Sequence, residues 1–311
     1  MPVKADQLCQ EFASLCHTAQ DVIPSDCLTT HSSWRSSAAQ PRLGAVERVI
    51  LVMRQHLGEL LTLQDMADVA CLSPYHFSRV FSCISGISPC RYLAALRLQE
   101  AKRLLLTTDM SATDVCFEVG YSSLGTFTTH FTQFIGMSPA RLHRSAIMIT
   151  EQILDELQSY NTDPLFDAAS GPTLSGEITV FSSRPALTFA GLFPAPIPQG
   201  KPVSGTVLKQ PGRFHMPPVP DGSYWLLAAA FPQSDDPLTY LLPDDDQIYV
   251  GINQAPIVIR SGRVEGETDL ILRPLQLTDP PILSALPILL SERMQADAAP
   301  PLELQMRQVG A

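Results

Sequence analysis

The segment SPYHFSRVFSCISGISP at residues 73–89 returns fifty positions later as SLGTFTTHFTQFIGMSP at residues 123–139. The positions that agree pair Ser73 with Ser123, Phe77 with Phe127, Phe81 with Phe131, Gly86 with Gly136, Ser88 with Ser138 and Pro89 with Pro139. A repeat at a fixed offset indicates that one structural unit is used twice. This repeat decides the fold of the first half of the chain.

The first copy predicts a helix, a tight turn and a second helix. Thr62 is expected to cap a helix that carries Asp65 in its first turn. Ser73 is expected to cap the next helix, which Gly86 ends in a left-handed conformation. One buried face of that second helix is predicted from helical spacing and consists of Phe77, Val80, Phe81 and Ile84.

The second copy repeats this pattern. Ser111 is expected to cap a helix over 112–119, Gly120 to turn the chain, and Ser123 to cap the following helix, which buries Phe127, Phe131 and Phe134. A long helix over 89–107 is expected to join the copies. Two helix-turn-helix units on one chain predict a monomer that reaches two successive segments of a DNA major groove.

Residues 45–144 resemble the DNA-binding domain of the AraC/XylS family of bacterial transcription regulators. The resemblance covers about a third of the chain and rests on SPYHFSRVF, GISPCRYLAALRLQEAKRLLL, VGYSSLGTF and FIGMSP, with 63–70 as the first scaffold helix. Helical periodicity alone is also typical of a seven-helix bundle without a DNA role. The paired pattern of cap, turn and cap argues against that alternative.

The resemblance implies that the outward face of the second helix in each unit contacts bases. Carried over by position, these residues are Tyr75, Ser78 and Arg79 in the first unit, and Leu124, Gly125, Thr126, Thr128 and Thr129 in the second. The family commonly has Arg where this chain has Thr129. A bidentate contact between Arg and guanine contributes about 1–3 kcal/mol of discrimination. The first unit is therefore expected to carry most of the specificity, and the second to position the protein or to read thymine methyl groups.

The negative charge of the chain is unevenly distributed. The net charge is −10, yet residues 45–146 contain nine Lys and Arg against eight Asp and Glu. Residues 151–311 contain nine against nineteen. A nearly neutral DNA-binding segment predicts few phosphate contacts and a modest dependence on salt. The acidic half is expected to face away from DNA.

The seven cysteines all lie at or before Cys116, with no CxxC pair. An odd number without a disulfide framework indicates a reducing compartment. The sequence shows no membrane-spanning run and no secretion signal, so a cytoplasmic protein without a membrane partner is expected. A zinc site can be drawn from Cys9, Cys16, His17, Cys27 and His31, but these residues lack close pairing. An amphipathic helix is the preferred interpretation, and no metal or cofactor is predicted.

Composition changes beyond residue 170, where twenty of the 27 prolines lie. Proline excludes long helices, and short β-prone runs occur at 177–181, 187–193, 203–208, 223–231, 247–252, 256–260 and 269–273. The predicted fold class is multidomain: an all-α double helix-turn-helix domain followed by an all-β Greek-key sandwich. The predicted divisions are an N-terminal helix and linker (1–44), the DNA-binding domain (45–146), a connector helix and linker (147–175), the sandwich (176–290) and a C-terminal tail (291–311).

The phrase Gly212-Arg213-Phe214 followed by PDGSY at 220–224 resembles carboxypeptidase-regulatory-like and transthyretin-like sandwiches, which implies a binding or spacer module without chemistry. His215 near Asp221 is compatible with a catalytic pair, but no GxSxG elbow supports it, and a strand-edge histidine is preferred. Asp244, Asp245 and Asp246 are compatible with calcium binding, but a solvated loop is preferred. The chain is therefore not expected to be an enzyme.

Three roles compete for the sandwich. These are homodimerisation or contact with a partner such as RNA polymerase, sensing of a small effector of unknown identity, and action as an enzyme domain. Short, proline-rich strands are expected to leave little room for a cavity, which favours dimerisation or partner contact. The whole chain is predicted to be a bacterial, sequence-specific regulator of transcription that binds double-stranded DNA.

Overall fold

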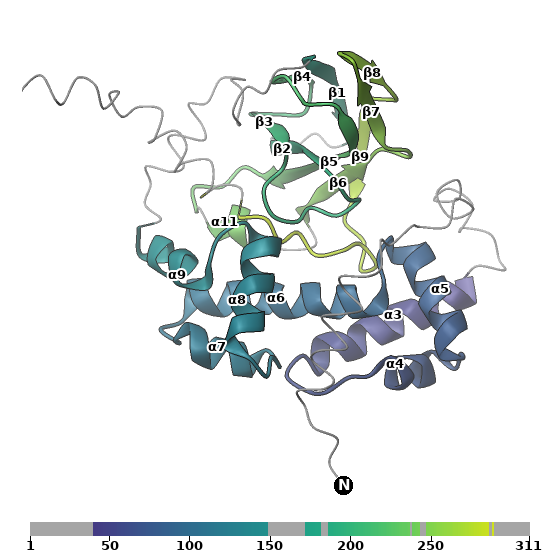
Figure 1. Ribbon diagram of the computed structural model, residues 1–311, viewed down its shortest axis with the longest axis vertical. Coiled ribbons are helices and arrows are strands. Elements are labelled where there is room, and N and C mark those ends of the chain that lie inside the picture. Colours follow the sequence, from purple (N-terminus) through teal and green to yellow (C-terminus); the bar gives the residue numbers. More distant parts are fainter. Residues whose placement is uncertain are drawn as a thin grey trace, which may run out of the picture.

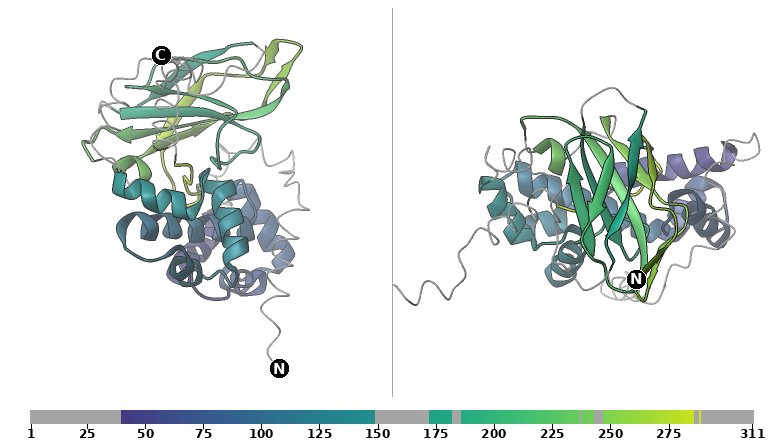
Figure 2. Two further views of the ribbon diagram at one scale, coloured as in Figure 1. Left: turned by 60° about the vertical axis from the view of Figure 1, so that its left-hand side comes forward. Right: turned by 90° about the horizontal axis from the view of Figure 1, so that it is seen from above.

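The computed structural model describes residues 40–148, 172–181, 186–236, 238–242, 247–285 and 288. A layer of helices carries a curved β-sheet on one side (Figures 1 and 2). Several predictions concern residues outside this description: the N-terminal helix with the candidate zinc ligands Cys9, Cys16, His17, Cys27 and His31, most of the connector (149–171), Asp244 to Asp246, and the C-terminal tail.

The helical layer contains α3 (Gln40–Gln55), α4 (Leu63–Ala70), α5 (Pro74–Ser85), α6 (Pro89–Thr107), α7 (Ala112–Glu118), α8 (Leu124–Ile135) and α9 (Pro139–Met148). Figure 1 shows α6 running through the layer, with α8 toward one end and α5 toward the other. Residues 40–44, predicted as part of a linker, belong to α3. Pro41 is compatible with the first turn of a helix, and the buried face of α3 begins directly afterwards, at Ala45.

The helix ends lie where the repeat predicted them. Thr62 Oγ1 accepts from the Asp65 backbone N–H (3.2 Å), and the Asp65 carboxylate accepts from the Thr62 N–H (2.8 Å). The Thr62 hydroxyl also donates to the Asp65 carboxylate (2.6 Å), and this hydrogen bond, with the one from the Thr62 N–H, lowers the pKa of Asp65. Ser111 caps α7 in the same way, through the Asp114 N–H. Gly86 and Gly136 end α5 and α8 with φ of 77° and 95°.

The two turns differ by one residue. The left-handed position is Cys71 in the first turn, two residues before Ser73, and Gly120 in the second, three residues before Ser123. A Cβ atom at Gly120 would lie 2.7 Å from the Leu57 carbonyl oxygen. The second turn therefore needs glycine for both its positive φ and its close approach to the chain that follows α3.

Each helix-turn-helix segment packs on its own core. The first core joins α3, α4, α5 and the first half of α6, with Phe77, Phe81 and Tyr92 fully buried. The second joins the other half of α6 to α7, α8 and α9 around Phe127 and Phe131. Because α6 contributes to both cores, it fixes the two units relative to each other.

The strands are β1 (Leu174–Val180), β2 (Ala186–Phe193), β3 (Ser204–Leu208), β4 (Arg213–Met216), β5 (Gly222–Pro232), β6 (Tyr249–Ile252), β7 (Ile257–Arg260), β8 (Arg263–Glu265) and β9 (Leu270–Pro274), and a short helix, α11, spans Leu238–Leu241. Each predicted run overlaps a strand. The short strands β4 and β8 were not predicted, because their alternation of polar and apolar residues extends over only four and three residues.

These strands form one nine-stranded sheet, with the order β3-β2-β5-β6-β9-β1-β4 and the β7–β8 hairpin paired to β5. β1 and β9 are parallel. The terminal strands β3 and β4 approach each other, so the sheet curves around its own core. A β-rich C-terminal region is thus confirmed, but the Greek-key sandwich is not, because β5 pairs with β2, β6 and β7 and keeps the sheet continuous.

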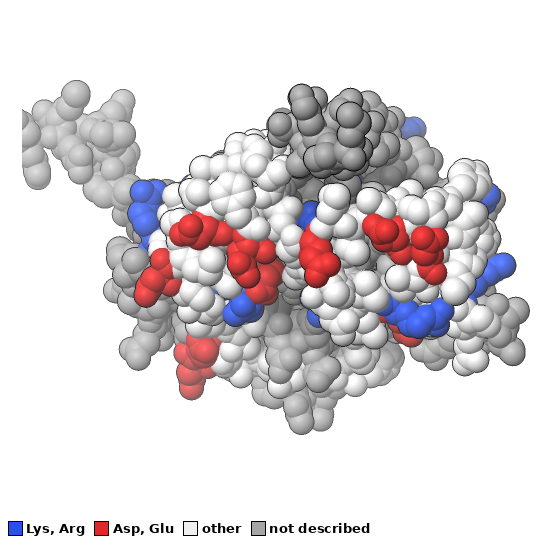
Figure 3. Space-filling view, turned by 90° about the horizontal axis from the view of Figure 1, so that it is seen from below, with Lys and Arg blue, Asp and Glu red and all other residues white. Residues whose placement is uncertain are grey.

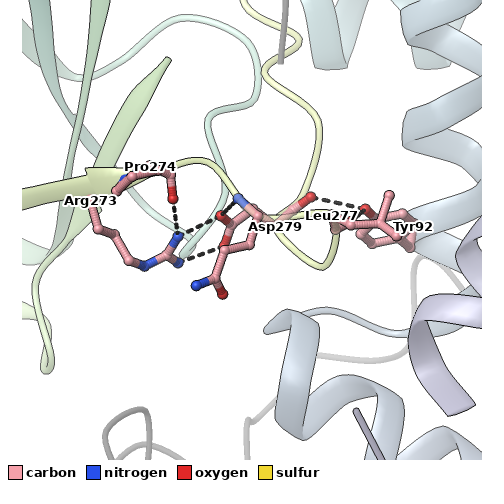
Figure 4. Close-up of polar contacts among 6 residues, drawn as sticks. Tyr92, Arg273, Pro274, Leu277 and Asp279 are labelled. Atoms are coloured by element: carbon pink, nitrogen blue, oxygen red, sulfur yellow. Dashed lines mark hydrogen bonds and ion pairs between the residues drawn. The ribbon is translucent and has the colours of Figure 1, made fainter. Parts of the chain in front are cut away.

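Residues 274–285, which follow β9, fasten the sheet to the helices. Arg273 and Asp279 form a bidentate ion pair, with both N–O distances 2.7 Å. The Tyr92 hydroxyl of α6 lies 2.7 Å from the Leu277 carbonyl oxygen (Figure 4). Farther along α6, Lys102 Nζ donates to the carbonyl oxygens of Ile282 (3.1 Å) and Leu283 (3.4 Å). The 274–285 segment therefore follows α6 past both cores.

The end of α8 also binds the sheet region. The Phe134 carbonyl accepts from the Gly200 N–H (2.7 Å), and the Ile135 carbonyl accepts from the Ala285 N–H (3.1 Å). The last carbonyls of a helix lack partners within the helix. Here the sheet region supplies them, so it is joined directly to the end of α8.

Candidate nucleic-acid interface

The outward face of α5 presents the residues predicted for the first unit. Tyr75 is 75% exposed, Arg79 is exposed and Ser78 is half-buried. On the opposite face, Phe77 and Phe81 are fully buried, and the Phe81 ring meets the Tyr92 ring edge-on at 5.4 Å. This packing holds α5 against α6. Among the described residues, no hydrogen bond or ion pair engages the Arg79 guanidinium, so its donors are free for a ligand.

The second unit presents a different surface. Gly125 and Thr129 are exposed, Leu124 is 40% exposed, and Thr126 and Thr128 are half-buried. The Thr129 hydroxyl donates to the Gly125 carbonyl (3.0 Å). Because its proton is already used within the helix, Thr129 offers mainly a methyl group and acceptor electron pairs. This surface is better suited to apolar or phosphate-adjacent contacts than to reading guanine.

The spacing of the units is set by α6. Its 19 residues correspond to a length of about 28 Å. One turn of B-DNA measures about 34–36 Å. The side chain of Arg97 on α6 donates to the carbonyl oxygens of Leu57 (2.9 Å) and Glu59 (2.6 Å), which fixes the segment between α3 and α4. A rigid connection of this length can place two helices in neighbouring stretches of one groove.

Carboxylates are absent from both α5 and α8. Neither α5 nor α8 contains Asp or Glu, whereas α4 carries Asp65 and Asp68, and α7 carries Asp114 and Glu118. Figure 3, which views the molecule from below, shows acidic side chains in a band across that face, with basic ones mainly around it. Such a face is not the extended basic surface typical of nonspecific DNA binding. By contrast, α5 and α8 carry no acidic side chain that would repel phosphates.

His215 and Asp221, whose pairing the sequence did not favour, contact different partners. His215 Nδ1 lies 2.8 Å from Ser175 Oγ, across the pairing of β1 and β4. The Asp221 carboxylate accepts from the Ser261 N–H at 2.8 Å. His215 is thus a histidine on the terminal strand of the sheet. Within the described part of the chain, no group of three His, Cys, Asp or Glu side chains is arranged to hold a metal, and no helix is long and apolar enough to cross a membrane.

The described cysteines include both thiols and a disulfide-bonded residue, so they do not decide between a reducing and an oxidising compartment. Among the described cysteines, Cys71, Cys90 and Cys116 are not in a disulfide, whereas Cys83 is disulfide-bonded. A reducing compartment therefore stays a prediction.

The expectation that the β-region leaves little room for a cavity is wrong. A cavity of about 570 Å³ lies between the sheet and the helical layer. Strand length did not reveal it, because the space lies outside the core of the sheet. One signal was available: β2 is buried along its entire length, and a strand that is apolar on both faces must be covered on both.

Comparisons with known proteins concern the helical layer. Residues 66–145 match the family described as helix-turn-helix domain. The uncharacterized HTH-type transcriptional regulator YobQ of Bacillus subtilis is 38% identical over 98 residues, which are 32% of this chain and 40% of YobQ. The bifunctional transcriptional activator/DNA repair enzyme AdaA of the same species is 32% identical over 103 residues, which are 33% of this chain and 49% of AdaA. The chain thus spans less than half the length of these relatives.

Among solved structures, the DNA-binding domain of AdpA, determined in complex with a target DNA, is 29% identical. The match covers 34% of this chain and 96% of the AdpA chain, with a TM-score of 0.33. The family match and the relatives show that residues 66–145 are a helix-turn-helix domain similar to those of transcriptional regulators. They do not confirm the resemblance of the β-region to carboxypeptidase-regulatory-like or transthyretin-like modules.

Proposed function

We propose that this protein is a sequence-specific transcription regulator that inserts α5 and α8 into successive major-groove segments of double-stranded DNA. The observation that carries this proposal is the pair of helices without carboxylates, each exposing one face, near opposite ends of α6. Relatives named as transcriptional regulators support it. A bacterial regulator of this kind acts in the cytoplasm, where the DNA is.

The two helices have different tasks in this proposal. Arg79 donates to the O6 and N7 atoms of guanine, and Tyr75 and Ser78 contact neighbouring positions. On α8, the contacts are made by Leu124, Gly125, Thr126, Thr128 and Thr129, which read thymine methyl groups or position the protein on the backbone. The absence of a carboxylate near Arg79 on α5 leaves its charge available to DNA.

In vitro selection from a random duplex library tests this function. The full-length protein should enrich a motif with two conserved parts, the stronger of which contains guanine. A variant with both Tyr75→Ala and Arg79→Ala serves as the control and should lose the stronger part. No enrichment above that obtained with unrelated protein would contradict the assignment.

The β-region is not proposed to be catalytic, because Asp221 and His215 bind different partners. Dimerisation, or contact with a partner such as RNA polymerase, stays a prediction for this region. Sedimentation of the full chain at several concentrations tests the homodimer directly. A sedimentation coefficient that stays that of a monomer throughout would exclude it.

A further inference from the structure

The cavity between the sheet and the helices has a largely apolar and aromatic wall. Phe189, Phe231 and Tyr240 pack edge-on against one another, with ring centroids 5.6–6.4 Å apart, and form part of its lining. Trp225 lies on the same face of β5 as Phe231 and is half-buried. Small residues on the sheet, Gly191 and Ala229 among them, leave the space open.

The size of the cavity matches a small molecule. A volume of about 570 Å³ falls within the range of roughly 300–1,000 Å³ that is usual for ligand pockets. The charged lining groups Arg273 and Asp279 neutralise each other through their ion pair. The side-chain oxygen of Asn253 is already hydrogen-bonded within the protein, because it accepts from the Leu226 N–H at 2.9 Å. A wall of this kind disfavours ions and favours a neutral aromatic molecule.

The lining also includes residues that hold the recognition helices. Ile84, Ser85 and Gly86, at the end of α5, face the cavity. Residues 275–284 contribute another wall, and the same segment binds Tyr92 and Lys102 of α6. Ser284 lines the cavity and donates to the Gly200 carbonyl, and the Gly200 N–H binds the end of α8. The cavity therefore adjoins the structures that position both helices.

We propose that this cavity is an effector site for a neutral, predominantly aromatic small molecule whose binding changes the affinity for DNA. The regulatory part of this proposal rests on the proposed DNA-binding function. A ligand that fills the space contacts the end of α5 and the 275–284 wall together, so its affinity depends on how the end of α5 and this wall are placed. Differential affinity of this kind is what couples two sites.

The first experiment tests binding, with the neutral dye N-phenyl-1-naphthylamine as the probe. Its fluorescence should rise on titration with the full-length protein and saturate at one molecule per chain. Ala229→Leu and Ala229→Phe narrow the cavity in steps and should weaken binding progressively, by at least about tenfold for Phe. Ala140→Phe, at an exposed position outside the cavity, is the matched control and should bind like wild type.

Circular dichroism must show that each variant is folded. If Ala229→Phe disrupts the sheet, dye binding by Ala229→Leu alone decides whether narrowing the cavity weakens binding. Equal affinity in wild type and both Ala229 variants would overturn the site, because the dye would then bind elsewhere. Failure of the wild type to bind the dye would also overturn it.

The second experiment tests coupling. Affinity for the selected duplex, measured by fluorescence anisotropy, should change about fivefold or more with saturating dye in wild type, and not in Ala229→Phe. An unchanged affinity in wild type would overturn the regulatory role. If wild type binds no duplex at all, the DNA-binding function fails, while the dye titration still decides whether the cavity is a ligand site.

Discussion

Arg79 is the side chain that most distinguishes the exposed face of α5 from that of α8. It is exposed on α5, and the position that corresponds to it by the fifty-residue offset is Thr129, whose hydroxyl already donates to Gly125. A guanidinium can form a bidentate contact with guanine, whereas this threonine offers mainly a methyl group. The sequence alone predicted both exposed positions, because helical spacing separates buried from exposed residues.

We expect Arg79→Ala to weaken binding to the selected duplex by about 1–3 kcal/mol and to relax the preference at one base pair. Thr129→Ala should cost less, since no bidentate contact is lost. Anisotropy titrations on one duplex and its single-base variants measure both effects. Equal losses from the two substitutions would show that the units contribute equally to specificity.

The burial of Lys102 predicts that the stability of the folded protein depends on pH. Its side chain is only 1% exposed, and desolvation lowers the pKa of its ammonium group to about 7. The unfolded chain keeps a value near 10.5. Between these values the unfolded state binds more protons, so stability rises with pH from about 7 to 10.5, and the gain is absent below 7. The neutral amine retains two N–H donors for the carbonyls of Ile282 and Leu283.

Urea unfolding at pH 7 and pH 9.5 should therefore show a larger gain in stability for wild type than for Lys102→Met. The comparison between the two proteins cancels the titration of the cysteines, which both share. Identical gains would mean that the Lys102 ammonium stays charged throughout this range.

At the scale of elements, the helix caps were the most predictable features. Thr62, Ser111 and the glycines at 86 and 136 act within one turn of their own position, so local sequence is enough to identify them. The extra residue in the second turn was not evident from the sequence. The fifty-residue offset aligns α5 with α8, but the turns that precede these helices differ in length by one residue. The closure of the sheet depends on pairing between β1 and β9, about ninety residues apart, which strand periodicity does not specify.

Gly86 and Gly120 provide a matched test of these turns. Both have positive φ, 77° and 83°, but a Cβ atom meets nothing within 4 Å at Gly86, whereas at Gly120 it meets the Leu57 carbonyl. Gly86→Ala should cost about 1 kcal/mol from the left-handed backbone, and Gly120→Ala clearly more. Thermal unfolding measures both changes. Equal costs would indicate that the chain around Leu57 yields without strain.

At the scale of the molecule, the contact between sheet and helices was the least predictable feature. Lys102 lies about 180 positions before its partners Ile282 and Leu283, and the sequence around it gave no sign that it would be buried. Likewise, the cavity arises only when the outer face of the sheet meets α5 and the 274–285 segment. Charge and composition correctly separated the two halves, but they carry no information on how the halves pack.

The helical layer should still fold alone as residues 40–148, because most of both cores comes from within it. Its melting temperature should fall by at least about 5 °C, since Leu241, Leu283, Ala285 and Ile288 no longer cover the second core. Its selected DNA motif should match that of the full chain, because every candidate reading residue precedes 130. An unfolded fragment, or a different motif, would place an essential element in the β-region.

Methylation protection of guanine N7, on a derivative of the selected duplex that carries guanine in the segments facing both α5 and α8, tests the insertion of these helices most directly, because this atom faces the major groove. The full-length protein should protect two groups of positions on one side of the duplex, about 10 base pairs apart. Arg79→Ala should abolish protection in one group only. A single protected group in wild type, or simultaneous loss of both groups in Arg79→Ala, would contradict reading by two units.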